Sequence, residues 1–237
     1  MKVNIDIDYE IVHKLALMCR ESTCPSIDFS RYGFKYSEVL MSSATDTLAI
    51  VCDGRFPTFV FGSEENVWES CLNSFLMPFK EVDPGARIDS TMHGYWTSLR
   101  HMVLAKVREF DCEEIVVTGH STAGAVALLA AADIAKNCPP VKPTAYVFGA
   151  PRCGDSRFVR LLQELSPGTI AFEHPGDPVP RMPGGAYAST YLRVGLDHDL
   201  STILRLMHIF PMVGRFFMDA FNEPSVYIDS IFGRIDT

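Results

Sequence analysis

Short apolar runs alternate with segments of helical periodicity along most of this 237-residue chain. Unbroken apolar runs are typical of strands that are covered on both faces of a sheet. The order strand, helix, strand, helix predicts an α/β fold, with a mostly parallel central sheet and helices on both faces. We expect strands at residues 47–52, 58–61, 114–118, 144–148 and 169–172.

Helices are predicted between these strands. In residues 91–110 the apolar side chains recur at three- and four-residue steps, which places them on one helix face. A second helix follows the strand at 114–118 directly, and a third is expected near residues 155–165. Because no linker, repeat or low-complexity segment interrupts the pattern, we expect residues 1–237 to form a single domain. The apolar face of the helix expected at residues 91–110 consists of Tyr95, Leu99, Met102, Val103, Val107 and Phe110.

Composition narrows the possible partners and compartments. With 47% hydrophobic and 21% charged residues the chain can bury a substantial core, and its formal charge of −8 argues against nucleic acid. We see no signal peptide, because acidic residues interrupt the apolar positions of the N-terminal segment and no small-residue cleavage site follows. We see no transmembrane segment, because charged residues and a proline interrupt the apolar stretch at 203–221. The seven cysteines are odd in number and scattered, which suits free thiols in a reducing compartment. The sequence therefore predicts an intracellular, cytoplasmic location.

The segment IVVTGHSTAGAVALLAAA at residues 115–132 carries the candidate chemistry. An apolar run, a Gly-His-Ser turn and an Ala/Leu-rich stretch form the outline of a nucleophile elbow, in which a serine sits on a sharp strand-to-helix turn. Small residues are needed around such a turn, and Gly119, Ala123 and Gly124 supply them around Ser121. Taken alone, the motif equally fits a plain strand, turn and helix with an incidental serine.

Three blocks in order carry a family resemblance: the elbow, YVFGAPRCGDSRF at 146–158 and HPGDPVPRMP at 174–183. Together they resemble the class 3 lipase family, a branch of the α/β-hydrolase fold, whose elbow reads Gly-His-Ser-Leu-Gly-Gly. Residues 59–75 and 92–96 are similar to the family's oxyanion-hole and lid segment and to its block before the elbow. The resemblance covers roughly residues 47–200, and it departs from the family pattern at Ala123, where glycine is usual.

The resemblance implies a catalytic triad in the chain order Ser, Asp, His that this fold uses. It makes Ser121 the nucleophile, Asp177 the acid and His198 the base. His198 lies in GLDHDLST, which resembles the family's Leu-Asp-His-Leu-Ser segment although Asp199 interrupts the match. His208 also follows Asp177 and is the alternative base, although its apolar surroundings favour a structural role.

The same resemblance implies an oxyanion hole and a lid. The backbone amide of Thr122, directly after the nucleophile, is one expected donor, and the amide of Ser63 is the other. Phe61 stands where the family has arginine, which affects local bracing rather than a backbone donor. Val67 and Trp68 are lid candidates on a short amphipathic helix, and the alternative is a surface helix that turns its apolar stripe to the core.

The implied function is a serine hydrolase that cleaves lipid carboxylic esters, either triacylglycerol or another acylglycerol. It needs no metal or organic cofactor, and its expected partners are the lipid ester substrate and, transiently, a membrane or lipid-droplet surface, with no nucleic acid. A phospholipase or a short-chain carboxylesterase would use the same residues. The departures at Phe61, at Ala123 and around His198 leave a further alternative, an inactive α/β-hydrolase scaffold that binds lipid or a protein.

Overall fold

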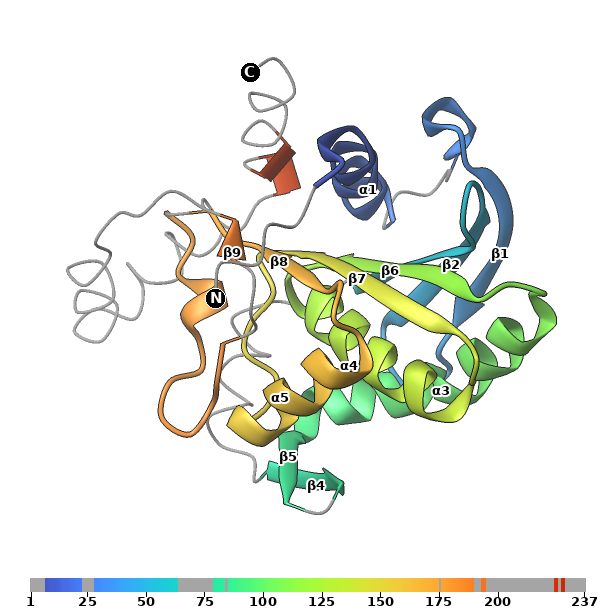
Figure 1. Ribbon diagram of the computed structural model, residues 1–237. Helices are drawn as coiled ribbons and strands as arrows, with labels where there is room; N and C mark the ends of the chain where they lie inside the picture. Colours follow the sequence, from blue (N-terminus) through green and yellow to red (C-terminus); the bar gives the residue numbers. More distant parts are fainter. Residues whose placement is uncertain are drawn as a thin grey trace.

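The computed structural model describes residues 7–22, 28–63, 79–83, 85–174, 176–189, 193–194, 224–225 and 227–228. Within this part of the chain a seven-stranded sheet runs in the order β1-β2-β3-β6-β7-β8-β9, and β4 and β5 pair separately (Figure 1). The strands are β1 (Lys35–Met41), β2 (Thr47–Asp53), β3 (Thr58–Ser63), β4 (Phe79–Asp83), β5 (Ala86–Asp89), β6 (Glu114–His120), β7 (Lys142–Phe148), β8 (Ile170–Phe172) and β9 (Arg193–Val194).

The sheet is mostly parallel, as the sequence predicts. β1, β2 and β3 pair antiparallel, whereas β3, β6, β7, β8 and β9 pair parallel. The central strands β3 and β6 are buried along nearly their whole length, which explains their unbroken apolar sequences. Because parallel strands end at one edge of the sheet, β3, β6, β7, β8 and β9 have their carboxyl ends at the same edge.

Helices cover both faces of the sheet (Figure 1). α1 (Tyr9–Glu21) lies on one face, and α3 (Ser90–Glu109), α4 (Ser121–Asn137) and α5 (Ser156–Leu165) lie on the other. The side of α1 holds a core in which Val12, Leu15 and Met18 pack with Phe172 and Tyr227. The opposite side holds a larger core built around α3 and α4.

α4 is the most deeply buried of these helices. Its residues from Ser121 to Ala132 are all buried, so it has no polar face over its first three turns. Alanine side chains allow it to approach the sheet closely, and it packs against β3, β6 and β7. The predicted helix after the strand at 114–118 is thus confirmed as the central helix of its layer.

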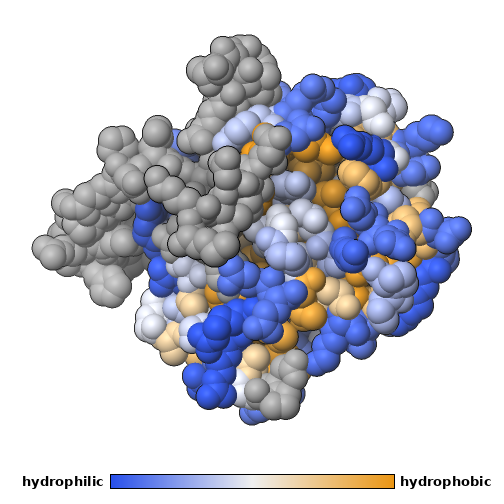
Figure 2. Space-filling model, viewed as in Figure 1, coloured by the Kyte–Doolittle hydropathy of each residue, from blue (hydrophilic) through white to orange (hydrophobic). Residues whose placement is uncertain are grey.

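Hydrophilic side chains cover most of the described surface in the view of Figure 2, with hydrophobic ones in patches between them. The five cysteines among the described residues are free thiols, and four of them are buried. Among the described helices, none is both long enough and apolar enough to cross a membrane.

The N-terminus of α5 depends on one carboxylate. Asp155 accepts hydrogen bonds from the amides of Arg157 (3.0 Å) and Phe158 (2.9 Å) and from Nε of Arg87 (3.1 Å). Burial opposes ionisation, but these amides and the Arg87 guanidinium outweigh it and hold the pKa of Asp155 below its ordinary value of 3.8. The folded protein therefore stabilises the charged form of Asp155 more than the unfolded chain does.

We predict that Asp155→Ala lowers the free energy of unfolding at pH 7 by about 1–2 kcal/mol, because α5 loses its cap. Asp155→Asn keeps a capping oxygen but loses the charge, so its deficit should be smaller. Since the folded pKa is depressed, the contribution of the charge is present above the unfolded pKa and lost as the pH falls through the folded pKa. Denaturant melts at pH 7 and pH 3 should therefore show the gap between wild type and Asp155→Asn closing in acid. Asp111→Asn, at an exposed position, is the control.

Candidate active site

Ser121 stands at the junction of a strand and a helix. β6 ends at His120, α4 begins at Ser121, and the backbone of Ser121 has φ +57°, which places it in the left-handed region. Among the described residues it is the one non-glycine residue with positive φ. Such a conformation costs an L-residue roughly 1–2 kcal/mol. It is the geometry of a nucleophile elbow, which holds a side-chain oxygen above the end of the sheet.

Two glycines make this turn possible. A Cβ on Gly119 would lie 2.5 Å from the carbonyl oxygen of Ala123, and a Cβ on Gly124 would lie 2.9 Å from the carbonyl oxygen of Gly119. Strand and helix therefore approach each other at a distance that only glycine allows at either position. Ala123, the departure from the family pattern, is buried in the core around α4, which accommodates its methyl group.

The Ser121 side chain is nearly enclosed, with 6% of the residue exposed. Its Oγ and the Oγ1 of Thr122 have no hydrogen-bond partner among the described residues. Because both residues lie in the first turn of α4, nearby backbone amides have no carbonyl within the helix to bind. These amides and the positive end of the helix dipole can stabilise an anion next to Ser121.

Ser63, the other predicted oxyanion donor, lies at the carboxyl end of β3. β3 is the parallel neighbour of β6, and Phe61 is in register with Gly119. Ser63 and Ser121 each lie two residues beyond that pair, so the sheet brings Ser63 to the edge from which the elbow rises. Phe61, which replaces the family's arginine, is buried and contacts the ring of Trp96 edge to face, so this position belongs to the core.

Asp177 lies on the loop after β8 and is completely buried. Its Oδ1 accepts a hydrogen bond from the amide of Val179 (2.8 Å), and its Oδ2 accepts one from the hydroxyl of Tyr227. Its backbone is held as well: its amide donates to the carbonyl of His174 (3.0 Å), and its carbonyl accepts from Nη1 of Arg181 (3.0 Å). The carboxylate is therefore fixed in position by its own loop and by a residue distant in sequence.

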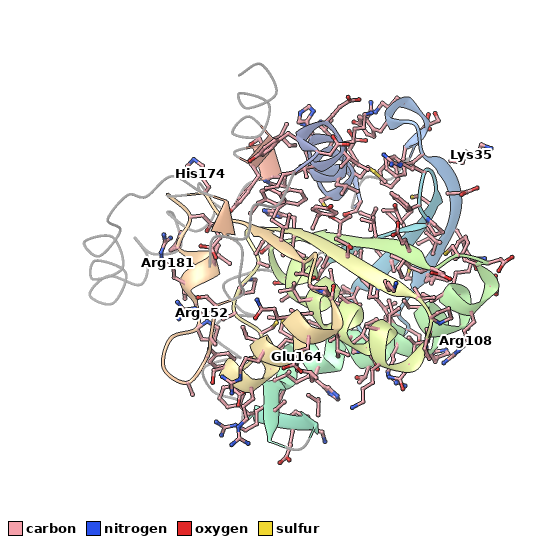
Figure 3. The ribbon with its side chains drawn as sticks, in the orientation of Figure 1. Lys35, Arg108, Arg152, Glu164, His174 and Arg181 are labelled. Atoms are coloured by element: carbon pink, nitrogen blue, oxygen red, sulfur yellow. The ribbon has the colours of Figure 1, made fainter. Side chains whose placement is uncertain are left out.

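The block after β7 supports the acid loop. Gly149, with φ +57°, donates from its amide to the carbonyl of Phe172 at the end of β8 (3.0 Å), and the amide of Arg152 donates to the carbonyl of Met182 (2.7 Å). Figure 3 shows Arg152, His174 and Arg181 on one side of the molecule, with Arg108 at the opposite end. The second and third sequence blocks thus meet beside the carboxyl edge of the sheet.

Tyr227 contacts the candidate acid, although no pattern in the sequence indicates this role. It lies near the C-terminus, in a tail with no recognisable pattern, and 2% of it is exposed. Its ring forms edge contacts with the rings of His120, Phe148 and His174 at centroid distances of 5.8–6.4 Å. Burial and then the charge and hydrogen bond of Asp177 raise the pKa of the Tyr227 hydroxyl well above its usual range, so it stays protonated.

The remaining predicted residues lie outside the described part of the chain. These are His198, its alternative His208, and the lid candidates Val67 and Trp68. β9, which pairs parallel with β8, ends at Val194, four residues before His198 in the sequence. The roles of these four residues stay predictions.

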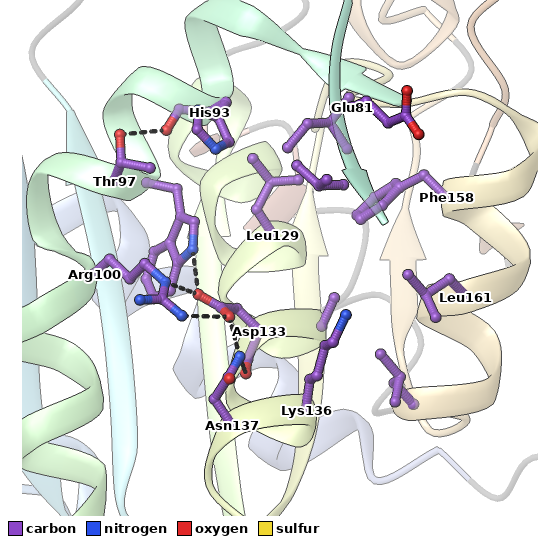
Figure 4. A pocket seen from close by; sticks show the side chains of 15 residues that line it. Glu81, His93, Thr97, Arg100, Leu129, Asp133, Lys136, Asn137, Phe158 and Leu161 are labelled. Carbon is purple, nitrogen blue, oxygen red and sulfur yellow. Dashed lines mark hydrogen bonds and ion pairs between the residues drawn. The ribbon is translucent and has the colours of Figure 1, made fainter. Parts of the chain in front are cut away.

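A cavity of about 440 Å³ lies away from this edge, between α3, α4 and α5 (Figure 4). Its polar centre is Asp133, which accepts hydrogen bonds from Trp96, Arg100 and Asn137. Asp133 follows Ser121 by twelve residues on α4, which is roughly 18 Å along a helix, so this cavity does not serve the serine. The described residues also contain no cluster of His, Cys, Asp and Glu that could hold a metal ion.

A mostly parallel sheet covered by helices on both faces, with a strained serine between strand and helix and a buried carboxylate after a later strand, defines the α/β-hydrolase class. A model of the family "Lipase (class 3)" matches residues 62–187, just over half of the chain. The chain therefore belongs to the class 3 lipase family.

Two curated relatives and one solved structure are similar to this chain at low sequence identity. The secreted mono- and diacylglycerol lipase A of Penicillium cyclopium is 25% identical over 179 residues, covering 70% of this chain and 56% of the relative. Phospholipase A1-II 1 of Oryza sativa is 28% identical over 166 residues, covering 58% and 42%. The chain thus spans about half the length of these curated relatives. Lipase II from Rhizopus niveus shares the fold, with a TM-score of 0.71 at 18% identity and 81% of each chain covered.

We predict that Gly119→Ala destabilises the protein and disrupts the elbow, because its Cβ would meet the backbone of Ala123 at a distance that no side-chain movement can relieve. A loss of about 2–4 kcal/mol in the free energy of unfolding is expected, in the range for overpacked or strained core positions. Denaturant melts measure this.

The matched control is Gly94→Ala, an exposed position inside α3 with nothing within 4 Å of the added Cβ. It should stabilise the protein by about 0.5–1 kcal/mol, because alanine favours helix over glycine. Equal effects at the two positions would contradict the tight approach of β6 and α4.

Proposed function

We propose that this protein is a serine hydrolase that cleaves the carboxylic esters of acylglycerols. The observation that carries the proposal is the left-handed backbone of Ser121 at the start of α4. A strained serine at a helix N-terminus is costly for folding, and such strain is concentrated at functional sites. The family to which the chain belongs supports the same activity.

In the proposed reaction the Ser121 hydroxyl attacks the ester carbonyl while His198 accepts its proton. Asp177 orients His198 and stabilises its protonated form. The amides of Ser63 and Thr122 donate hydrogen bonds to the oxyanion, whose charge they stabilise more strongly than that of the neutral carbonyl. His198 then protonates the departing alcohol, and water, activated by the same histidine, releases the fatty acid from Ser121.

The proposed substrates are neutral acylglycerols. The Penicillium relative is named for mono- and diacylglycerols, and its match covers more of this chain than that of the rice phospholipase A1. Both names describe enzymes that act on acyl esters, so the proposed chemistry at Ser121 is common to the two classes. We further propose transient contact with a membrane or lipid-droplet surface, and an intracellular location that suits the buried free thiols.

The alternative from another class is an inactive scaffold that binds lipid or a protein partner. The departure at Phe61 no longer favours it, because this side chain packs in the core. A scaffold would also gain nothing from a left-handed serine, since a residue with ordinary backbone geometry would make the same connection at lower cost.

We predict that Ser121→Ala abolishes both ester hydrolysis and labelling by a fluorophosphonate probe, with kcat/KM falling at least about 10³-fold. Hydrolysis should be measured on diacylglycerol emulsions, phosphatidylcholine vesicles and short-chain p-nitrophenyl esters. Ser156→Ala is the matched control, since Ser156 is also the first residue of a helix, α5, but is exposed and distant from the elbow in sequence. It should retain full activity.

Equal labelling of wild type and Ser121→Ala, with no hydrolysis of any substrate, would favour the scaffold. Faster turnover of phosphatidylcholine than of diacylglycerol would favour a phospholipase and overturn the acylglycerol proposal. Turnover confined to the short esters would favour a carboxylesterase.

We predict that His198→Ala lowers kcat at least about 10³-fold, because the nucleophile loses its general base. His208→Ala should retain most of the activity. Steady-state kinetics of both variants, with circular dichroism to verify folding, checks the assignment. The reverse pattern would make His208 the base.

A further inference from the structure

We propose that Tyr227 is a positioning residue of the active site, which holds the Asp177 carboxylate in the orientation that the triad requires. The inference rests on the proposed function, because it assumes that Asp177 is the triad acid. It extends the site to the C-terminal tail, beyond the part of the chain that the family model matches.

The two oxygens of Asp177 have separate donors on different parts of the chain. The amide of Val179 binds Oδ1 from within the acid loop, whereas the Tyr227 hydroxyl binds Oδ2 from fifty residues further along. One donor would leave the carboxylate free to pivot about that bond. Two donors on opposite oxygens fix the plane of the group.

The tyrosine is itself held on several sides. Its ring contacts the rings of His120, Phe148 and His174, which come from the elbow, the end of β7 and the loop after β8. Its hydroxyl also accepts a hydrogen bond from the amide of His174 (3.3 Å). Tyr227 therefore links the residue before the nucleophile to the loop that carries the acid.

The charges around Tyr227 favour its role as a donor. The titratable groups that face it are Asp177, Glu173, His120 and His174, and both carboxylates oppose loss of the phenolic proton. A hydroxyl that stays protonated donates to Asp177 at every pH at which the enzyme can work. Hydrogen bonds to a charged acceptor in a buried site are among the stronger ones in proteins.

This contact has a consequence for the triad base. A donor on Oδ2 withdraws negative charge from the carboxylate, so the carboxylate stabilises the protonated base less than an unbound one would. Loss of the donor should strengthen that stabilisation and loosen the geometry of the triad. The two effects predict separate signatures, a shift in the pH profile and a fall in kcat.

The test is Tyr227→Phe, which removes the hydroxyl and retains the ring. We expect kcat to fall about 10-fold with KM nearly unchanged, since orientation of the triad matters most in the transition state. The acid limb of the kcat/KM pH profile should move to higher pH. Thermal melts verify that the variant is folded.

Tyr187→Phe is the matched control. The Tyr187 hydroxyl donates to Oδ2 of Asp89 (2.7 Å), a buried carboxylate at the N-terminus of α3 that has no proposed role in the triad. Its removal should lower thermal stability without moving the pH profile or kcat. A tyrosine–carboxylate pair that matters only for folding behaves in this way.

Replacement of Tyr227 with a fluorinated tyrosine gives a second, shape-conserving measurement. Fluorination makes the phenol a stronger donor, so the acid limb should move to lower pH, opposite to the effect of Tyr227→Phe. An acid limb that stays in place in both variants, or a Tyr227→Phe profile that matches that of Tyr187→Phe, overturns the inference.

Failure of the proposed function is distinguishable from failure of this inference. A wild-type protein without esterase activity, or an Asp177→Asn variant with full activity, overturns both. An active wild type with an inactive Asp177→Asn variant and an unaffected Tyr227→Phe variant overturns only the role of Tyr227.

Discussion

The close approach of β6 and α4 at Ser121 is the constraint on which the site depends. The chain reverses from strand to helix within one residue, and that residue adopts a left-handed backbone. The reversal is possible because neither Gly119 nor Gly124 places a Cβ between the two elements. The strain at Ser121 is offset by the burial of α4, whose first three turns lie entirely in the core. A helix with a polar face at this end would not hold the turn as firmly.

The parallel part of the sheet then determines what can meet the serine. Since β3, β6, β7, β8 and β9 all end at one edge, residues far apart in sequence gather there without a dedicated connection. Ser63 arrives from one neighbouring strand of β6. Asp177 arrives from two strands away on the other side, on a loop anchored through Gly149 and Arg152.

Local sequence patterns predict the helices and strands around the elbow but not those at the periphery of the fold. The helix expected at 91–110 and the strand expected at 114–118 are found as α3 (Ser90–Glu109) and β6 (Glu114–His120), because their apolar residues face a continuous core. The sequence pattern does not indicate α1, since charged residues are interspersed among its apolar positions. Glu21 at its end is buried and bound by Arg31 and the hydroxyl of Tyr32 (2.6 Å). Arg31 and Tyr32 lie in a short turn after α1, and the hydrophobic periodicity of α1 does not indicate their contact with Glu21. The pattern does not indicate the hairpin β4–β5 either, because its short strands contain many charged residues.

The two hydrogen-bond donors to the Asp177 carboxylate differ in the same way: the local sequence indicates one of them and not the other. The Val179 amide lies two residues away, so any Asp in this tight, proline-rich loop would find it, and the sequence block identifies the position. The Tyr227 hydroxyl reaches the carboxylate from the α1 side of the sheet, where Tyr227 belongs to the same core as Phe148 and Phe172. A tyrosine in an unpatterned tail has no local signal that marks it as a donor. The carboxylate that the elbow needs is therefore held partly by packing on the opposite side of the sheet from α4, which couples the folding of the tail to the geometry of the site.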